Sequence, residues 1–213
     1  MHTACSERTN PLAENPRRHY DVRVKHYSII TSTLLCVALL CGCGPKGVAI
    51  DVRDAAEAGD RDAPYQVVVY SDFQCPYCRM AAAAIKELVR KHPDRVHYYF
   101  KHFPLRQHPQ SEKAAAAAEA ARLQGKFWEM HDLIFQNAIA LSDESYAEYA
   151  AMLGLDVEQF KRDAASEAVA TRIATDRSEA EYLGLDGTPY FIVNGAPYTG
   201  SFVDLIQEIE AAK

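Results

Sequence analysis

The sequence predicts an α/β fold in which a long helical block separates two groups of strands. First, residues 67–69 form a β-branched apolar run typical of a buried strand, and a helical pattern begins shortly after it. Second, helical spacing persists from residue 110 to about residue 184. Third, strand-like runs return after this block and precede a last amphipathic helix. The predicted order is β, α, β, a helical block, β, β, α.

The composition is that of one domain with a sizeable core. The chain has 213 residues and 48% hydrophobic content, so two full domains are not expected. Beyond Cys43 it carries 18 Lys and Arg against 26 Asp and Glu. This net negative charge disfavours nucleic acid and anionic surfaces as partners.

The first 43 residues are predicted to direct export. Residues 29–40 form an apolar run that is too short to span a bilayer and has the proportions of a signal-peptide core. The run ends in Leu-Cys-Gly-Cys, which resembles a bacterial lipobox whose last residue, Cys43, is lipidated. An ordinary signal peptide that is cut nearby is the alternative. We expect a chain that is lipid-anchored in a bacterial cell envelope and faces the periplasm or the exterior.

Residues 44–63 are predicted to be a flexible tether ahead of a domain over residues 64–213. This stretch contains several glycines and acidic residues. A short helical turn is expected within residues 54–59. Because only about 20 residues separate Cys43 from the domain, no second domain fits there.

The first half of the domain is predicted to contain two strands joined by a helix. The strand over residues 65–71 leads into a helix over residues 76–91. Residues 96–103 are rich in aromatic side chains and alternate in part, which favours a second strand. Pro104 ends it.

The block that follows is predicted to be helical throughout, and its alanine run is helical because Ala is the best helix former. Ser142 and Asp143 are candidate N-caps, while Gly125, Gly154 and Gly184 are candidate C-caps. The expected helices cover residues 111–124, 126–138, 143–153, 157–164 and 166–183.

The second half is predicted to be a β-hairpin and a closing helix. Residues 190–193 have the pattern of a buried strand, and Asn194-Gly195 is a strong hairpin turn. A return strand over residues 196–199 and a helix over residues 202–212 follow.

The strongest chemical signal is the C-x-x-C formed by Cys75 and Cys78 at the start of the first helix. Unpaired N–H groups and the partial positive charge at a helix N-terminus favour a thiolate, so we expect a lowered pKa for Cys75. Pro76 suits the first helical position, where a missing N–H has no consequence. Cys78 lies one turn in, is expected to be shielded, and would resolve a mixed disulfide formed at Cys75.

Other interpretations of the two cysteines remain open. A zinc site would need a second ligand pair, and no other C-x-x-C or H-x-x-x-H follows them. A structural disulfide would not need a strand-to-helix junction. A redox-inactive relic is the third alternative.

The histidines of the domain do not have the spacing of a metal site, so scattered surface or loop positions are expected for them. One of His102 and His108 could approach the cysteines, and Trp128 is expected in the core. No metal or organic cofactor is predicted. The histidines concerned are His92, His97, His102, His108 and His131.

The order of these elements resembles the thioredoxin fold, and the helical block resembles that of the DsbA family. This resemblance implies a mixed central sheet flanked by helices, with an inserted helical subdomain at about residues 110–184. The match spans residues 65–212. The similar motifs are Phe73-Gln74-Cys75-Pro76-Tyr77-Cys78, Phe103-Pro104-Leu105, Gly125-Lys126-Phe127-Trp128 and Gly187-Thr188-Pro189.

The resemblance also implies an active site. Pro189 would follow a cis peptide bond and hold Thr188 beside the Cys75 sulfur, and Pro76 and Tyr77 would support the site. One position departs from the family pattern. Relatives often place a buried acid six residues before the first cysteine, where this chain has Val69. Asp72 is nearer to the cysteines, but its side chain need not point inward.

The expected function is that of an exported thiol–disulfide oxidoreductase that oxidises protein thiols at Cys75 and Cys78. The alternatives are a reductase or isomerase, and a redox-idle module or chaperone that binds extended peptides. The expected partners are reduced or unfolded exported proteins and a membrane redox partner that restores the disulfide. The protein is expected to act as a monomer.

Overall fold

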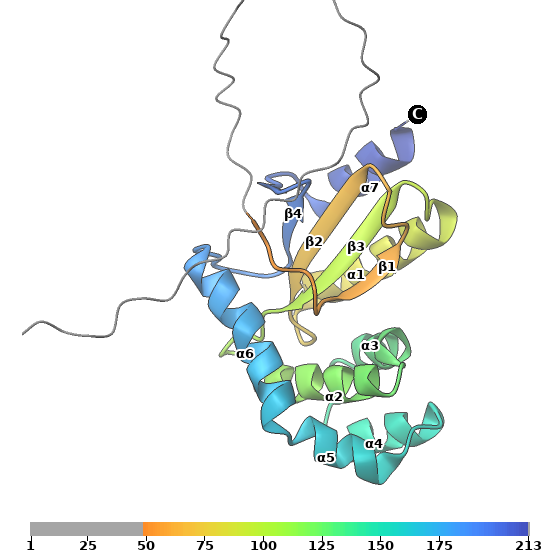
Figure 1. The fold of residues 1–213 in the computed structure, drawn as a ribbon, viewed down its shortest axis with the longest axis vertical. Helices are drawn as coiled ribbons and strands as arrows, with labels where there is room; N and C mark the ends of the chain where they lie inside the picture. Colours follow the sequence, from red (N-terminus) through yellow and green to blue (C-terminus); the bar gives the residue numbers. More distant parts are fainter. Residues whose placement is uncertain (1–48, 213) are drawn as a thin grey trace, which may run out of the picture. The chain divides into compact units, whose positions relative to one another are not determined.

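The computed structural model describes residues 49–212, and a five-stranded mixed sheet forms its centre (Figure 1). The strand order is β1-β3-β2-β4-β5, with β2 and β3 parallel and the other pairs antiparallel. The predicted signal segment and Cys43 lie outside the described residues. The strands are β1 (Ala56–Gly59), β2 (Tyr65–Ser71), β3 (Val96–His102), β4 (Tyr190–Val193) and β5 (Ala196–Pro197).

The first strand corrects the prediction for the segment before the domain. Residues 54–59 contain no helical turn, because Ala56–Gly59 pairs antiparallel with β3 and places Ala56 opposite Phe100. The indole N–H of Trp128, in the helical block, donates to the carbonyl of Glu57 at 3.0 Å. This hydrogen bond ties the strand to the helical block. The sheet therefore includes part of the stretch that was expected to be a flexible tether.

Seven helices occur within residues 49–212, and none of them is long and apolar enough to cross a membrane. The predicted helical block from α2 to α6 is confirmed. Each helix in it begins and ends within two residues of the predicted position. The helices are α1 (Pro76–Lys91), α2 (Ser111–Leu123), α3 (Phe127–Gln136), α4 (Asp143–Met152), α5 (Val157–Ala164), α6 (Glu167–Tyr182) and α7 (Phe202–Ala211).

The predicted helix ends are confirmed in part. Ser142 caps α4 through a capping box, whereas Asp143 is the first residue of that helix. Gly125, Gly154 and Gly184 each follow the last helical turn by two residues and have positive φ, as the αL position after a helix requires.

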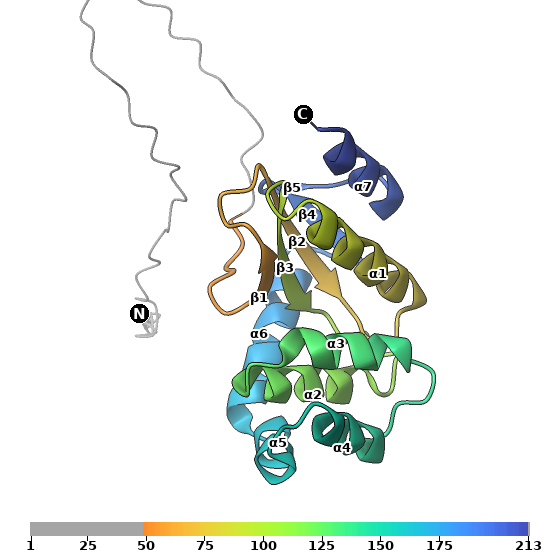
Figure 2. The same ribbon diagram turned by 90° about the vertical axis from the view of Figure 1, so that its right-hand side faces the viewer.

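Helices α1 and α7 lie along one face of the sheet, and the C-terminal part of α6 reaches the other side (Figure 2). Val67 and Val69 belong to the larger core, which includes side chains of α1 and α7, while Val68 and Tyr70 pack with Ala180 of α6. This alternation follows from the period of two along a strand. The helix α1 is the crossover that two parallel neighbours require, so the end of β2 leads directly into its N-terminus.

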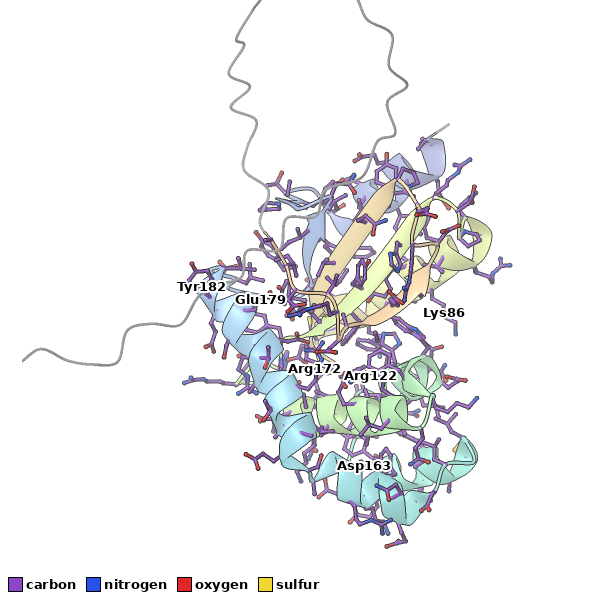
Figure 3. The ribbon with its side chains drawn as sticks, viewed as in Figure 1. Lys86, Arg122, Asp163, Arg172, Glu179 and Tyr182 are labelled. Atoms are coloured by element: carbon purple, nitrogen blue, oxygen red, sulfur yellow. The ribbon has the colours of Figure 1, made fainter. Side chains whose placement is uncertain are left out.

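A buried ion-pair cluster fixes α6 against the sheet. The ammonium of Lys101 on β3 lies 2.7 Å from the Asp176 carboxylate and 2.8 Å from that of Glu179, and it donates to the Asp51 carbonyl. Arg172 also pairs with Asp176, at 2.6 Å. Figure 3 labels Arg172 and Glu179 on this helix. Because each charge in the cluster is paired, its burial is compensated.

Candidate active site

The junction after β2 places Cys75 at the N-cap of α1. Its backbone is extended (φ −73°, ψ 121°), and Pro76 is the first helical residue. The N–H of Cys75 donates to the Asp72 carbonyl at 3.1 Å, and its own carbonyl accepts from the N–H of Arg79. The predicted position of the C-x-x-C at a strand-to-helix junction is therefore confirmed.

The two sulfurs have different surroundings. Both cysteines are free thiols, and Cys78 is 1% exposed against 5% for Cys75. The Cys75 thiol lies 3.3 Å from the Thr188 carbonyl, whereas the Cys78 sulfur accepts from the N–H of Asp72 at 3.4 Å. As predicted, Cys78 is the more shielded of the pair.

The surroundings shift the two cysteine pKa values in opposite directions. The pKa of Cys75 is lowered to about 5, mainly by a hydrogen bond from the Cys78 side chain, with further contributions from the Thr188 hydroxyl and the N–H groups of Cys78 and Tyr77. Burial raises the pKa of Cys78. The site therefore favours a thiolate at Cys75 beside a thiol at Cys78. The helix N–H groups contribute, as predicted, but the neighbouring thiol contributes most.

The loop before β4 brings Thr188 to the cysteines. The Thr188–Pro189 peptide bond is cis, as predicted. The buried Thr188 hydroxyl has no hydrogen-bond partner among residues 49–212, and its position beside the sulfurs lowers the pKa of both. Tyr77, between the cysteines, is 65% exposed, and Met80 is 54% exposed. Large apolar side chains thus reach solvent close to the reactive pair.

No acid occupies the position that is often acidic in relatives. Val69 is buried in the core. Hydrogen bonds from the Ser71 hydroxyl and the Asp72 N–H lower the pKa of Cys78, against the larger effect of its burial. Proton transfer at this sulfur therefore does not involve a carboxylate at position 69.

The structure settles the orientation of Asp72, which the sequence had left open. Its side chain is 1% exposed, and its carboxylate lies 2.9 Å from Nδ1 of His108. His108 therefore approaches the turn over residues 72–75, here called the redox turn, as was expected of one of two histidines. The sequence signal for this residue is an acid directly after a buried strand, because a carboxylate buried there requires hydrogen-bond donors.

The expectation of scattered surface histidines is wrong for three of them. His97, His102 and His131 are buried, and their partners explain why the fold tolerates them. His102 lies 2.9 Å from the buried carboxylate of Glu119, while His97 and His131 contact Glu57 and Asp132, respectively.

An aromatic cluster connects the redox turn with the helical block. The ring of Phe73 packs against Phe100 at 5.4 Å, Phe135 at 4.8 Å and His131 at 5.7 Å, measured between ring centroids. Two of these partners, Phe135 and His131, lie on α3. The block therefore supports the turn that carries the cysteines. Trp128 is partly buried against this core, as predicted.

Two hollows lie between α1 and α3, with volumes of about 80 and 320 Å³, and both are lined by Ala82, Lys86, His131 and Asp132. Neither hollow is lined by Cys75 or Cys78. These two hollows therefore do not hold the reactive pair.

Comparisons with known proteins agree with this geometry. The family described as Thioredoxin matches residues 53–208. A thioredoxin-like oxidoreductase from Silicibacter pomeroyi DSS-3 is 33% identical, with a TM-score of 0.62 over 73% of this chain and 90% of that one. The thiol-disulfide exchange protein alpha-DsbA2 from Wolbachia pipientis is 23% identical, with a TM-score of 0.64 over 73% of this chain and 86% of that one. At this identity the second likeness concerns the fold alone.

A curated relative is named as an antiporter and not as an oxidoreductase, and its chain is much longer than this one. The Na(+)/H(+) antiporter NhaA 3 of Salinispora tropica is 43% identical over 145 residues, which are 68% of this chain. These residues make up 22% of the antiporter, so the chain spans about a fifth of the length of that relative.

Proposed function

The chain belongs to the thioredoxin family and has the fold of DsbA-like thiol–disulfide oxidoreductases, and from this premise we propose that it oxidises pairs of thiols in exported proteins. The observation that carries the proposal is the asymmetry of the two sulfurs. Cys75 is stabilised as a thiolate at the start of α1, whereas Cys78 is more deeply buried and retains its proton.

The proposed reaction begins with the disulfide form of the pair. A substrate thiolate attacks the Cys75 sulfur, the bond to Cys78 breaks, and the Cys78 sulfur leaves and takes up a proton. The second substrate thiolate then attacks the substrate sulfur of the mixed disulfide and releases Cys75 as a thiolate. Two electrons pass to the protein, and the substrate gains a disulfide. A separate electron acceptor must restore the pair.

The lowered pKa of Cys75 favours oxidation over reduction. Thioredoxin has a reactive-thiol pKa of about 7 and a potential of about −270 mV. A value near 5 for Cys75 is about two units lower. Two units correspond to about 60 mV for a two-electron couple, so we expect a potential near −210 mV and a pair that is more oxidising than thioredoxin.

The test of the proposal is oxidation of a reduced, unfolded protein by the purified disulfide form. We expect rapid oxidation by the wild type and none by Cys75→Ser. Cys78→Ser keeps the Cys75 nucleophile and should accumulate a mixed disulfide with a substrate that carries a disulfide. Full activity of Cys75→Ser would instead support a redox-idle module that binds extended peptides.

The direction of electron flow is tested by equilibration with glutathione redox buffers. A potential near −210 mV supports the oxidase. A potential near −270 mV would favour a reductase. Efficient reshuffling of a scrambled disulfide protein, with weak net oxidation, would favour an isomerase.

We further propose that the protein acts at a bacterial cell envelope, anchored by a lipid on Cys43. The sequence pattern before this residue supports the proposal. Mass analysis of the protein from membranes, compared with a Cys43→Ser variant, tests it. Loss of the lipid mass and of membrane association in the variant is expected. An unmodified wild-type chain would contradict it.

Cation transport is not proposed for this chain. The antiporter match covers only 22% of that relative, so the activity of the whole antiporter is not carried over to this chain. The C-x-x-C at the start of α1 supports thiol chemistry instead.

A further inference from the structure

The side chain of Asp72 has more hydrogen-bond donors than a surface carboxylate could be expected to attract. Its oxygens accept from the N–H of Gln74 and the N–H of Leu105, both at 2.7 Å, and from Nδ1 of His108 at 2.9 Å. The hydroxyl of Ser111 donates to it as well. One donor comes from the redox turn, and three come from residues 105–111, which follow β3 in the chain.

This arrangement compensates the burial of a charge. A carboxylate that is taken out of water without partners is strongly unfavourable, and hydrogen bonds to a charged group are among the stronger ones. With four donors, Asp72 has its lone pairs satisfied in a position that is 1% exposed. The geometry is therefore maintained only while residues 105–111 stay against the redox turn.

The backbone of the same residue contacts both cysteines. Its N–H donates to the Cys78 sulfur at 3.4 Å, and its carbonyl accepts from the N–H of Cys75 at 3.1 Å. A second link runs parallel to the carboxylate, because the N–H of Gln110 donates to the side chain of Gln74 at 2.6 Å. Whatever moves the Asp72 side chain therefore moves the backbone that surrounds the sulfurs.

We propose that Asp72 is a positioning residue for the exchange reaction: its buried carboxylate ties residues 105–111 to the redox turn and so holds the two sulfurs against the first turn of α1. This inference rests on the proposed thiol chemistry and adds to it the group that maintains the sulfur geometry. Asp72 does not touch a substrate through its side chain, and it acts through the backbone on either side of it.

The variant Asp72→Asn has nearly the same shape but presents an amide NH₂ to groups that donate. At least one donor then loses its acceptor, and the turn is expected to relax. The Cys75 sulfur would move away from the N–H groups that stabilise its thiolate. We expect a tenfold weaker acidity of Cys75, a rise of one pKa unit, and a potential lower by about 30 mV.

The sign of the change separates positioning from a simple effect of charge. Removal of a negative charge near a thiolate, with no change in geometry, would make the thiol more acidic. A Cys75 pKa that rises in Asp72→Asn supports positioning. A pKa that falls or does not change overturns it.

The matched control is Asp176→Asn. Asp176 is also a buried aspartate with several donors, since it accepts from the N–H of His102 and pairs with Lys101 and Arg172. Both variants should lose stability. Only Asp72→Asn should shift the thiolate titration and the potential. Equal shifts in the two variants would mean that the cysteines respond to loss of stability in general, which would overturn the proposal.

A milder variant keeps the proposal testable if Asp72→Asn does not fold. Ser111→Ala removes one donor and leaves the carboxylate in place. We expect a two- to threefold weaker acidity of Cys75, with the helix-cap variant Ser166→Ala as control. An unchanged titration in Ser111→Ala, with the same folded far-UV spectrum, would also count against positioning.

The failure of this inference can be told apart from failure of the proposed function. The wild-type titration tests the function, because an ordinary Cys75 pKa in the unaltered protein removes the basis of the oxidase. The difference between wild type and Asp72→Asn tests the inference alone.

Discussion

The lowered pKa of Cys75 should make the stability of the reduced protein depend on pH. In the folded chain this pKa is about 5, against about 8.5 for a free cysteine. A group whose pKa is depressed on folding stabilises the folded state above its unfolded pKa, and this stabilisation is lost as the pH falls through its folded pKa. The relevant window therefore extends from about pH 8.5 down to about pH 5.

The magnitude follows from the two pKa values. At pH 7 the thiolate stabilises the folded state by a free energy that corresponds to about two pKa units. At pH 5 the stabilisation corresponds to only about 0.3 of a unit. The difference is about 2 kcal/mol. Cys78 does not contribute to this difference. Its raised pKa keeps it a thiol in the folded chain between pH 5 and pH 7, and a free cysteine is also mostly protonated over these pH values.

The assay is urea unfolding in the presence of reductant, followed by fluorescence of Trp128, the single tryptophan. Cys75→Ser is the reference, because buried histidines with lowered pKa values, such as His97 and His131, also destabilise the folded state in acid. Their effect cancels in the comparison. We expect the stability advantage of the wild type to fall by about 2 kcal/mol between pH 7 and pH 5. Parallel profiles for the two proteins would refute the reasoning.

Three further outcomes are expected. Thr188→Val removes a hydroxyl that lowers the pKa of Cys75, and absorbance titration of the thiolate should show a rise of about half a unit; an unchanged value would exclude the hydroxyl. Lys101→Met leaves buried carboxylates without their shared cation and should cost about 3 kcal/mol in urea unfolding, with the Cys75 titration unaltered; a neutral effect would contradict the ion-pair account. Gly59→Ala adds a Cβ 2.0 Å from the Val96 carbonyl oxygen at φ +94°, so thermal unfolding should show a loss of about 2 kcal/mol or more; wild-type stability would show that β1 can shift at little cost.

The parts of the fold that were predicted correctly have strong local signals. The run at residues 67–69, the alanine-rich helix and the Asn194-Gly195 turn each specify their structure within a few residues. β1 was missed because Ala-Glu-Ala-Gly has little preference for a strand. It becomes one through pairing with β3, which lies about 40 residues further along the chain.

The site shows the same division between local and long-range signals. The C-x-x-C and the Thr188–Pro189 loop were identified from short patterns, and the structure brings the Cys75 sulfur within 3.3 Å of the Thr188 carbonyl. The orientation of Asp72 could not be predicted, because its burial depends on donors 33 to 39 residues away. The buried histidines were missed for the same reason, since the partner of His102 lies on α2.

The most direct test of the account is the ionisation of Cys75 in the reduced wild-type protein, followed by thiolate absorbance at about 240 nm with Cys75→Ser as the blank. The account predicts a single transition with a pKa of about 5, while Cys78 stays protonated through neutral pH. A transition near 8.5, the ordinary value for a cysteine, would contradict it.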